Sequence, residues 1–408
     1  MPGSALDLKP ALRRRLGLLL LVLYGTGITI GAGIYVLIGA VAARAGIYSA
    51  WSFVLAAVVM ALTVGSYAEL ATRYPVSAGE AAYVRAAFQS RFLSTTVGLL
   101  TFATGVVASA AVTLGSAGYI RQFIDLPVPV IVIAVVLLLG AVAVWGILES
   151  VVVAGVFTLI EAGGLIWIIA SALHAGSPIG STLAEIPPPD LPTLSGIAFA
   201  SLLAFFAFVG FEDLANVVEE VKVPHRNIPW AMTLTLLVTS TLYILIAAIS
   251  VTVVPPDKLA ASSAPLSLVF GVVTGINPAA FNLIAIVATL NTILAQMTTA
   301  SRVIYGMARQ GDLPVHLSKI HAGTGTPWIA TAAALLAIVG LALIFPIEKL
   351  AEGTSLATLA TFALVNLSLL RIRSRGIRST APHVRVPIWM PAIGALTCLV
   401  MIASALVL

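Results

Sequence analysis

Charged residues are scarce in this chain of 408 residues, because Asp, Glu, Lys and Arg make up only 9% of it. Soluble globular domains carry about 25% charged residues. The hydrophobic share is 60%, and the mean hydropathy is +1.09. This composition predicts an all-α polytopic membrane protein that has no sizeable soluble module.

Cysteine is nearly absent, since Cys398 is the only one. A single cysteine excludes a disulfide within the chain and a thiolate metal cluster. The five histidines lie near or between hydrophobic segments, so we expect neither a metal site nor a cofactor. The sequence has no GxSxG, HExxH or GxxxxGK[ST] motif, so we expect no catalytic residues and no enzyme.

Long hydrophobic runs dominate what remains. A membrane helix needs about 20 apolar residues. The sequence predicts eleven spans, at about 16–40, 47–70, 93–120, 128–147, 151–173, 194–218, 230–254, 279–305, 328–346, 354–372 and 387–408. Within the connection 255–278 we expect a short re-entrant or surface helix from about Ala264 to Val273.

The basic residues predict the orientation. With residues 1–15 in the cytoplasm, 17 of the 21 Lys and Arg residues fall on the inner side, which is the expected bias. The other four are Arg44, Arg121, Lys258 and Lys349. The net charge of +5 then reflects topology and anionic lipid at the inner face of the cell membrane, and not a nucleic-acid partner.

The first span is interrupted by GTGITIGAGIYVLIG, with five glycines between Gly25 and Gly39. Glycine is poor in helix interiors, and an irregular backbone at bilayer depth is tolerated only inside protein or along a polar cavity. Packing of a neighbouring helix on Gly27 and Gly31 is the alternative reading. The interruption favours a carrier that uses free backbone groups to bind a small zwitterion.

The sixth span carries a second interruption, in AFFAFVGFEDLANVV, where Gly210 is followed by Glu212 and Asp213. Spans one and six lie five apart, so they cross the membrane in opposite directions. Matching interruptions in two antiparallel halves point to an inverted-repeat carrier. We therefore expect two five-helix repeats at 16–173 and 194–372, joined by an external loop at 174–192, with an additional helix at 387–408.

Four segments resemble signatures of amino-acid permeases: GAGIYV, YAELATRYPVSAGEAAYV, FFAFVGFE and SRVIYGMARQGDLP. Over roughly residues 10–372 the chain is similar to the amino acid–polyamine–organocation superfamily. The resemblance implies two inverted five-helix repeats with broken helices one and six. Many relatives have twelve spans where this sequence shows eleven, which leaves a homodimer an open possibility.

The same resemblance implies a substrate site at the two breaks. It places the substrate carboxylate on backbone amides near Gly31, Ala32 and Gly33, and the ammonium on carbonyls near Thr29, Phe206 and Val209. Helix-end partial charges suit both groups. The complete set of expected binding residues is Thr29, Ile30, Gly31, Ala32, Gly33, Phe206, Ala207, Phe208, Val209 and Gly210.

Four further side chains have more than one reading. Phe206 and Phe208 are candidates for a lid over the substrate, or are core aromatics. Glu161, at mid-membrane depth, is a candidate for proton coupling, because a carboxyl shielded from water can hold a proton. Hydrogen bonding to a neighbouring helix and cation binding are its alternatives. Glu212 resembles a gating acid, or is a solvated acid in a vestibule.

Other charges are expected to be structural, with Glu69 and Glu80 pairing with Arg73 and Arg85.

The sequence as a whole predicts a secondary active transporter of amino acids across the cell membrane. Few charges lie near the breaks, which favours neutral amino acids over arginine or lysine. Uptake is expected to be proton-coupled, with Glu161 as the candidate group. An exchanger of amino acids or amines with the same fold is the alternative.

Overall fold

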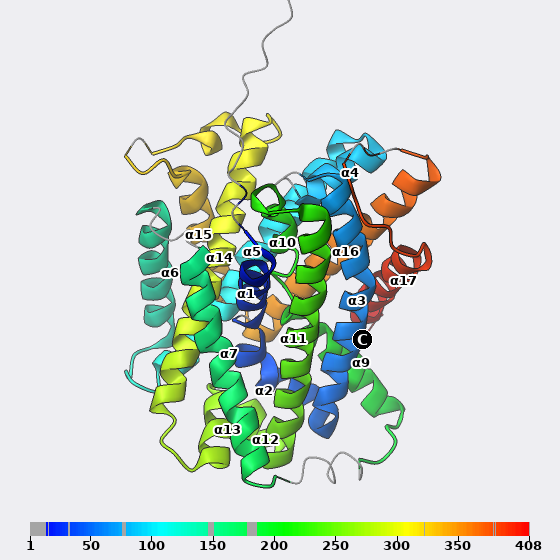
Figure 1. Ribbon diagram of the computed structural model, residues 1–408. Coiled ribbons are helices and arrows are strands. Elements are labelled where there is room, and N and C mark those ends of the chain that lie inside the picture. The colour runs from blue at the N-terminus through cyan, green and yellow to red at the C-terminus, as the bar shows by residue number, and fades with distance from the viewer. Residues whose placement is uncertain are drawn as a thin grey trace, which may run out of the picture.

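The computed structural model describes residues 14, 16–31, 33–75, 79–145, 151–177, 186–321, 323–377, 379 and 381–407, without the side chains of 151–154 and 406–407. Nearly all of the N-terminal segment 1–15, Ala32, residues 178–185 of the expected external loop and Leu408 lie outside the described residues. The described part of the chain is almost entirely helical (Figure 1), which confirms the predicted fold class.

The helices follow one another with short connections. They are α1 (Leu18–Ile30), α2 (Gly33–Ala45), α3 (Ser49–Arg73), α4 (Gly79–Phe88), α5 (Arg91–Ile120), α6 (Val128–Trp145), α7 (Val151–His174), α9 (Leu191–Phe206), α10 (Asp213–Asn216), α11 (Pro224–Val253), α12 (Pro256–Ala261), α13 (Pro265–Thr274), α14 (Ala279–Arg309), α15 (Trp328–Ile344), α16 (Ile347–Ser374) and α17 (Trp389–Val407). The short helix expected near 264–273 is α13, and α12 before it was not expected.

Among the described residues, seven helical runs are long and apolar enough to cross a membrane. The first of them, 33–73, combines α2, a 3-10 turn at Gly46–Tyr48 and α3. The shorter apolar helices α1 and α9 are halves of the interrupted spans one and six. The interruptions therefore account for part of the difference between seven membrane-length helices and eleven predicted spans.

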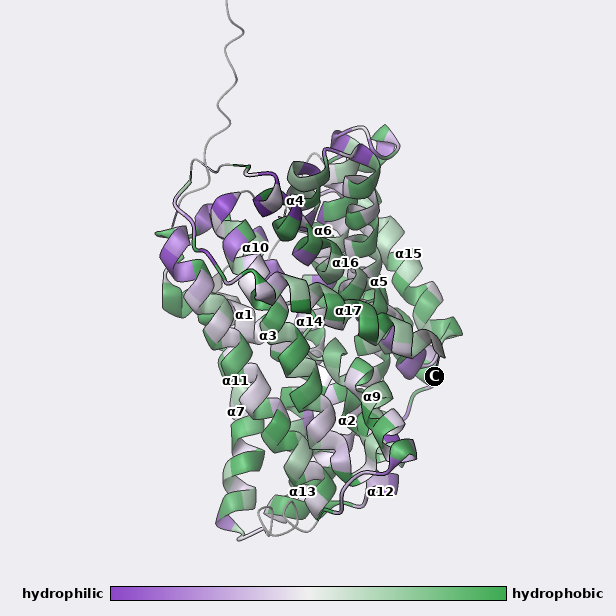
Figure 2. Ribbon diagram, turned by 90° about the vertical axis from the view of Figure 1, so that its right-hand side faces the viewer, coloured by the Kyte–Doolittle hydropathy of each residue, from purple (hydrophilic) through white to green (hydrophobic). Residues whose placement is uncertain are grey.

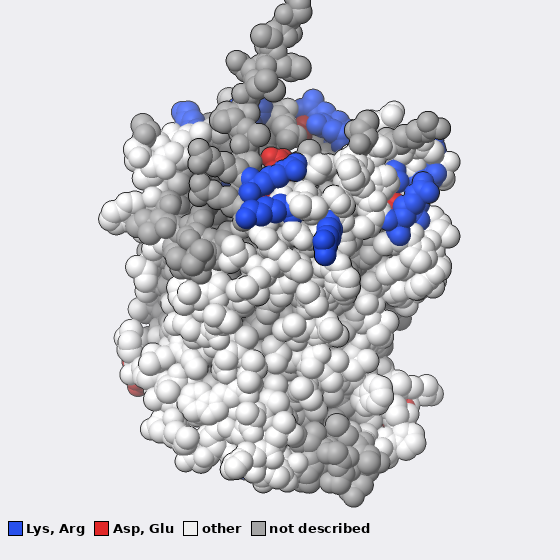
Figure 3. All heavy atoms as spheres, viewed as in Figure 1, with Lys and Arg blue, Asp and Glu red and all other residues white. Residues whose placement is uncertain are grey.

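The surface is divided as a bilayer requires. Hydrophobic residues cover the middle of the helical bundle, and hydrophilic residues gather toward its two ends (Figure 2). Large apolar side chains such as Leu137 and Leu138 on α6 are more than half exposed, as side chains that face lipid are. Lys and Arg gather toward the end that carries α4 (Figure 3), and we call this end of the molecule the basic end.

The two interrupted helices lie inside the bundle and run in opposite directions. The chain passes from α1 near the basic end to α2, and from α9 back toward α10 at the basic end (Figure 1). α1 packs against α7 and α11, whereas α2 packs against α9. Main-chain hydrogen bonds also join the segment before α1 to the segment after α10: Leu16 N donates to Glu220 O at 3.0 Å, and Lys222 N donates to Leu16 O at 2.9 Å.

Candidate functional site

The first break is a point of close helix packing. α1 ends at Ile30, Gly31 N donates back to Gly27 O at 3.3 Å, and α2 begins at Gly33. A Cβ atom at Gly31 would overlap Thr292 Oγ1 on α14. Gly31 therefore does serve helix packing, the alternative reading of this glycine, because only glycine lets α14 approach so closely.

The second break is a run of tight turns. The amides of residues 207, 208 and 209 donate to the carbonyls of 204, 205 and 206 at 3.1, 2.9 and 3.1 Å, so the helix narrows to 3-10 bonding where α9 ends. Gly210 then takes a φ of +105°, a conformation that L side chains rarely adopt. The carboxylate of Glu212 accepts a hydrogen bond from Gly210 N at 3.0 Å, and this bond holds the turn.

The two breaks touch each other. A Cβ atom at Gly33 would overlap the backbone of Ala207, and one at Gly210 would come within 2.5 Å of Ile28 Cγ2. The two breaks, which lie far apart in the sequence, are therefore in direct contact inside the bundle. In this conformation the backbone of each break fills the space beside the other.

Tyr243 on α11 connects both breaks. Its hydroxyl oxygen lies 2.7 Å from Thr29 O and 3.0 Å from Ala207 O. The side chain is fully buried, and its ring packs edge-on against Phe208 with 5.2 Å between centroids. Sequence reasoning missed this residue. The available signal was the one tyrosine of the predicted span 230–254, a polar aromatic side chain near the middle of that span.

Phe206 and Phe208 are 0% and 1% exposed, as core aromatics are. Phe206 O accepts from Val209 N, so one of the carbonyls expected to bind the ammonium has a backbone partner here. The structure thus brings the described members of the expected binding set together at one place. Whether they bind substrate stays a prediction.

Glu161 lies on α7 beside the first break. Thr158, one turn earlier on the same helix face, packs against Gly27 of α1. Glu161 is 0% exposed, and its Oε1 accepts from Asn291 Nδ2 at 3.0 Å. Among the described residues no partner meets its Oε2. The main-chain oxygen of Glu161 accepts from the Tyr35 hydroxyl at 2.6 Å.

A second group of buried carboxyls lies toward the basic end. Glu80 on α4 is 4% exposed and accepts from the Tyr67 hydroxyl at 3.1 Å, whereas Arg85, its expected partner, is exposed. The pairing of Glu80 with Arg85 was therefore wrong. Burial raises the pKa of Glu80 from 4.5 to about 7, and the charge of nearby Asp213 adds to the rise.

Glu69 forms the buried ion pair of this region. It pairs with Arg73 at 3.4 Å, as expected, and also with Arg373 on α16, whose Nε lies 3.0 Å from Glu69 Oε1. Val386 N donates to its other oxygen at 3.0 Å. One carboxylate thus ties α3, α16 and the chain before α17 together.

Among the described residues, no group of three or more His, Cys, Asp or Glu side chains is placed to hold a metal ion. What the structure places at its centre is a pair of interrupted helices, with backbone groups, a tyrosine hydroxyl and a buried carboxyl around them. These features, in a bundle of membrane-length apolar helices, define a membrane transporter of the broken-helix class.

The particular family follows from sequence. The profile of the family described as "Amino acid permease" matches residues 21–408, so the chain belongs to the amino acid permease family. Its members are transporters and not enzymes.

Individual relatives agree with this. The branched-chain amino acid permease BcaP of Bacillus subtilis is 29% identical over 90% of this chain and 82% of its own length. The vacuolar cationic amino acid transporter 4 of Arabidopsis thaliana is 31% identical over 89% of this chain, which spans 64% of that protein.

Solved structures agree on the fold. A manganese transporter of Eremococcus coleocola, solved as a mutant, has a TM-score of 0.71 at 14% identity, and the match covers 99% of this chain and 90% of that one. At this identity the likeness shows the fold alone.

Proposed function

We propose that this protein is a secondary active transporter that moves neutral amino acids into the cell by alternating access, coupled to protons. The observation that carries the proposal is the contact of the two helix breaks at Gly33 and Ala207 in the interior of the bundle. Breaks of this kind expose helix-end amides and carbonyls to a central ligand. The N-terminus faces the cytoplasm in this proposal, because the basic end then lies on the inner side.

The substrate carboxylate binds amides at Gly31, Ala32 and Gly33, and its ammonium binds carbonyls of Thr29, Phe206 and Val209. In the conformation described, Thr29 O lies within hydrogen-bond distance of Tyr243, and Gly33 lies against Ala207. Substrate entry therefore requires the two breaks to separate. The carbonyls of Thr29 and Phe206 must then exchange their present hydrogen-bond donors, Tyr243 and Val209, for the substrate ammonium. Phe206 closes over the bound substrate, and Glu212, which holds the turn at Gly210, acts in the gate.

Neutral substrates are favoured because the side chains of the second break, from Phe206 to Gly210, carry no charge. BcaP is named for branched-chain substrates, which supports the same choice. The cationic amino acid transporter 4 of Arabidopsis is named for positively charged substrates, so substrate charge is the first property to test.

Proton coupling is assigned to Glu161. Its Oε2 has no partner among the described residues, and a charged carboxylate so placed would be costly. A proton on Glu161 removes that charge, and water that reaches the site after a conformational change allows its release. Asn291 holds the carboxyl in position through the bond to Oε1.

The substrate test is a thermal-shift screen of the purified protein against the twenty amino acids and the matching decarboxylated amines. A ligand that binds the native state raises its apparent stability. We expect a shift with neutral amino acids and a much smaller one with their amines, which lack the carboxylate. Equal shifts would contradict a carboxylate site of backbone amides. Larger residues at Gly33 are unsuitable for this test, because they would collide with Ala207 and disturb the fold.

The coupling test is Glu161→Gln in proteoliposomes, with Glu348→Gln, a carboxyl outside the bundle centre, as the control. Glutamine keeps the shape and the bond to Asn291 but cannot release a proton. The variant should exchange labelled substrate yet fail to accumulate it when an inward proton gradient is applied. Accumulation at the wild-type level would show that Glu161 is structural. Wild-type protein that exchanges but never accumulates would favour the exchanger alternative.

A further inference from the structure

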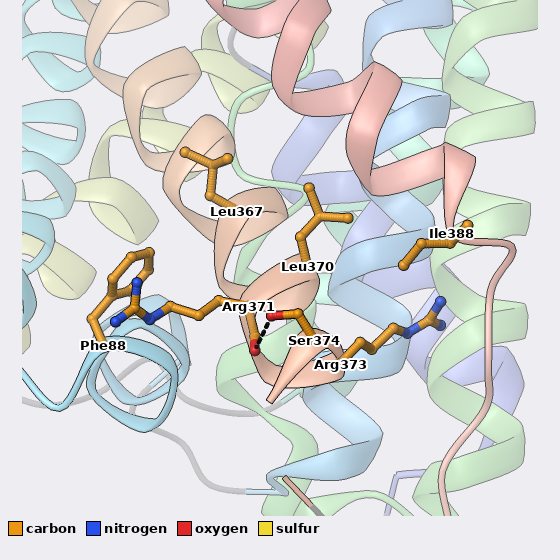
Figure 4. A pocket seen from close by; sticks show the side chains of 7 residues that line it. All are labelled: Phe88, Leu367, Leu370, Arg371, Arg373, Ser374 and Ile388. Atoms are coloured by element: carbon orange, nitrogen blue, oxygen red, sulfur yellow. Dashed lines mark hydrogen bonds between the residues drawn. The ribbon is translucent and has the colours of Figure 1, made fainter. Parts of the chain in front are cut away.

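A cavity of about 710 Å³ opens at the basic end, between α4, the last turns of α16 and the residue before α17. Two arginines of α16 extend in opposite directions along it, Arg371 toward Phe88 and Arg373 toward the side of Ile388 (Figure 4). The side chains of Leu367 and Leu370 lie between them. The wall therefore combines fixed cations with an apolar surface.

Arg371 is held in place without being neutralised. Its Nε donates to Ala87 O at 3.1 Å, and its guanidinium carbon lies 4.7 Å from the centre of the Phe88 ring. Among the described residues no carboxylate forms an ion pair with it, and its terminal nitrogens keep their N–H donors. A guanidinium fixed in this way is suited to bind a phosphate through two parallel hydrogen bonds.

The surroundings add further positive charge. Glu69 is the only carboxylate among the described residues that pairs with Arg73 and Arg373, so one negative charge meets two positive ones. A second cavity of about 710 Å³ shares Arg373 and also includes Arg385. This end of α16 thus carries an excess of cations that an anion would complement.

The apolar part of the wall continues into the lipid-facing surface. Leu367 is 37% exposed and Ile388 is 54% exposed. They lie on α16, a membrane-length helix, and directly before the apolar helix α17. Apolar side chains of this kind, beside arginines at the level where a span ends, match the two parts of a phospholipid.

We propose that this cavity binds an anionic glycerophospholipid. Its phosphate lies on the free N–H groups of Arg371. Its acyl chains run along Leu367, Leu370 and Ile388. The apolar wall selects a lipid over free phosphate, and the unneutralised Arg371 selects an anionic headgroup over a zwitterionic one.

The test uses the full-length protein in detergent, with native mass spectrometry while phosphatidylglycerol or phosphatidylcholine is titrated in. The test variant is Arg371→Gln. The matched control is Arg309→Gln, which removes another arginine stacked on a ring, with 5.8 Å from its guanidinium carbon to the centre of Tyr305, but outside the cavity. Arg371→Lys retains the charge, and thermal melting checks that each variant is folded.

We expect phosphatidylglycerol to bind more tightly than phosphatidylcholine. Arg371→Gln should lower the affinity for phosphatidylglycerol about fivefold, which corresponds to about 1 kcal/mol of binding free energy. Arg371→Lys should recover much of the loss, and Arg309→Gln should change little. Equal binding of the two lipids, or an equal loss in Arg309→Gln, would overturn the proposal. Displacement of the lipid by millimolar inorganic phosphate would overturn it too, because the cavity would then be an ion site.

Discussion

The buried carboxyl of Glu80 makes a prediction about pH that can be worked out from the structure. Its pKa in the folded protein, about 7, lies above its ordinary value of 4.5, because burial disfavours the charged form. Between these values the native state holds a proton that the unfolded chain has released. The stability that this proton provides is present below about pH 4.5 and is lost as the pH rises through 7.

The magnitude follows from the shift. About 2.5 units, from 4.5 to about 7, at 1.36 kcal/mol per unit gives about 3 kcal/mol of lost stability above pH 7. Glu80→Gln has no charge to bury, and its amide oxygen can still accept from the Tyr67 hydroxyl. The variant should therefore be more stable than the wild type at pH 8 by up to about 3 kcal/mol, and no more stable at pH 4.5.

The assay compares thermal melting of wild-type protein and Glu80→Gln in detergent at pH 4.5, 6 and 8. Asp257→Asn, which alters a carboxyl on α12 away from this group, is the control and should follow the wild type at each pH. A Glu80→Gln gain that is the same at pH 4.5 and pH 8 would refute the reasoning. It would show that Glu80 ionises without cost, as a carboxyl in contact with water does.

Two further substitutions test the contact of the breaks. Tyr243→Phe removes the O–H near the Thr29 and Ala207 carbonyls, so thermal melting should show a loss of about 1–3 kcal/mol; an unchanged melting temperature would mean that water replaces the hydroxyl. Gly210→Ala places a methyl group where φ is +105° and Ile28 is close, so it should destabilise by about 1–3 kcal/mol. Gly340→Ala, in open space on α15, is its control and should be neutral or stabilising.

The sequence located the broken helices through clustered glycines and the resemblance to permeases. Glycine weakens a helix, and five glycines lie between Gly25 and Gly39. A glycine alone does not mark a break, because Gly163 and Gly340 lie within the continuous helices α7 and α15. Glu161 was found for a similar reason, since an ionisable group at mid-membrane depth stands out from its neighbours.

Contacts between distant segments could not be found in this way. The sequence does not indicate that Glu69 meets Arg373, or that the hydroxyl of Tyr243 lies near Thr29 O, because both depend on how the helices pack. Glu80 was assigned to a pair with Arg85 because both residues lie near the cytoplasmic end of the second predicted span. α4 begins at Gly79, which has a φ of +46°, and in the fold Glu80 is buried while Arg85 is exposed.

The hydroxyl of Tyr243 has one hydrogen to donate but two carbonyl acceptors within reach. A phenol hydroxyl carries a single hydrogen, yet two carbonyl oxygens, one from each broken helix, lie within hydrogen-bond distance of it. At any instant the hydroxyl can donate its hydrogen to only one of these oxygens, and the other oxygen receives no hydrogen bond from Tyr243. The molecule thus keeps one acceptor ready at the meeting point of its two halves, and a rotation of one hydroxyl decides which half offers it.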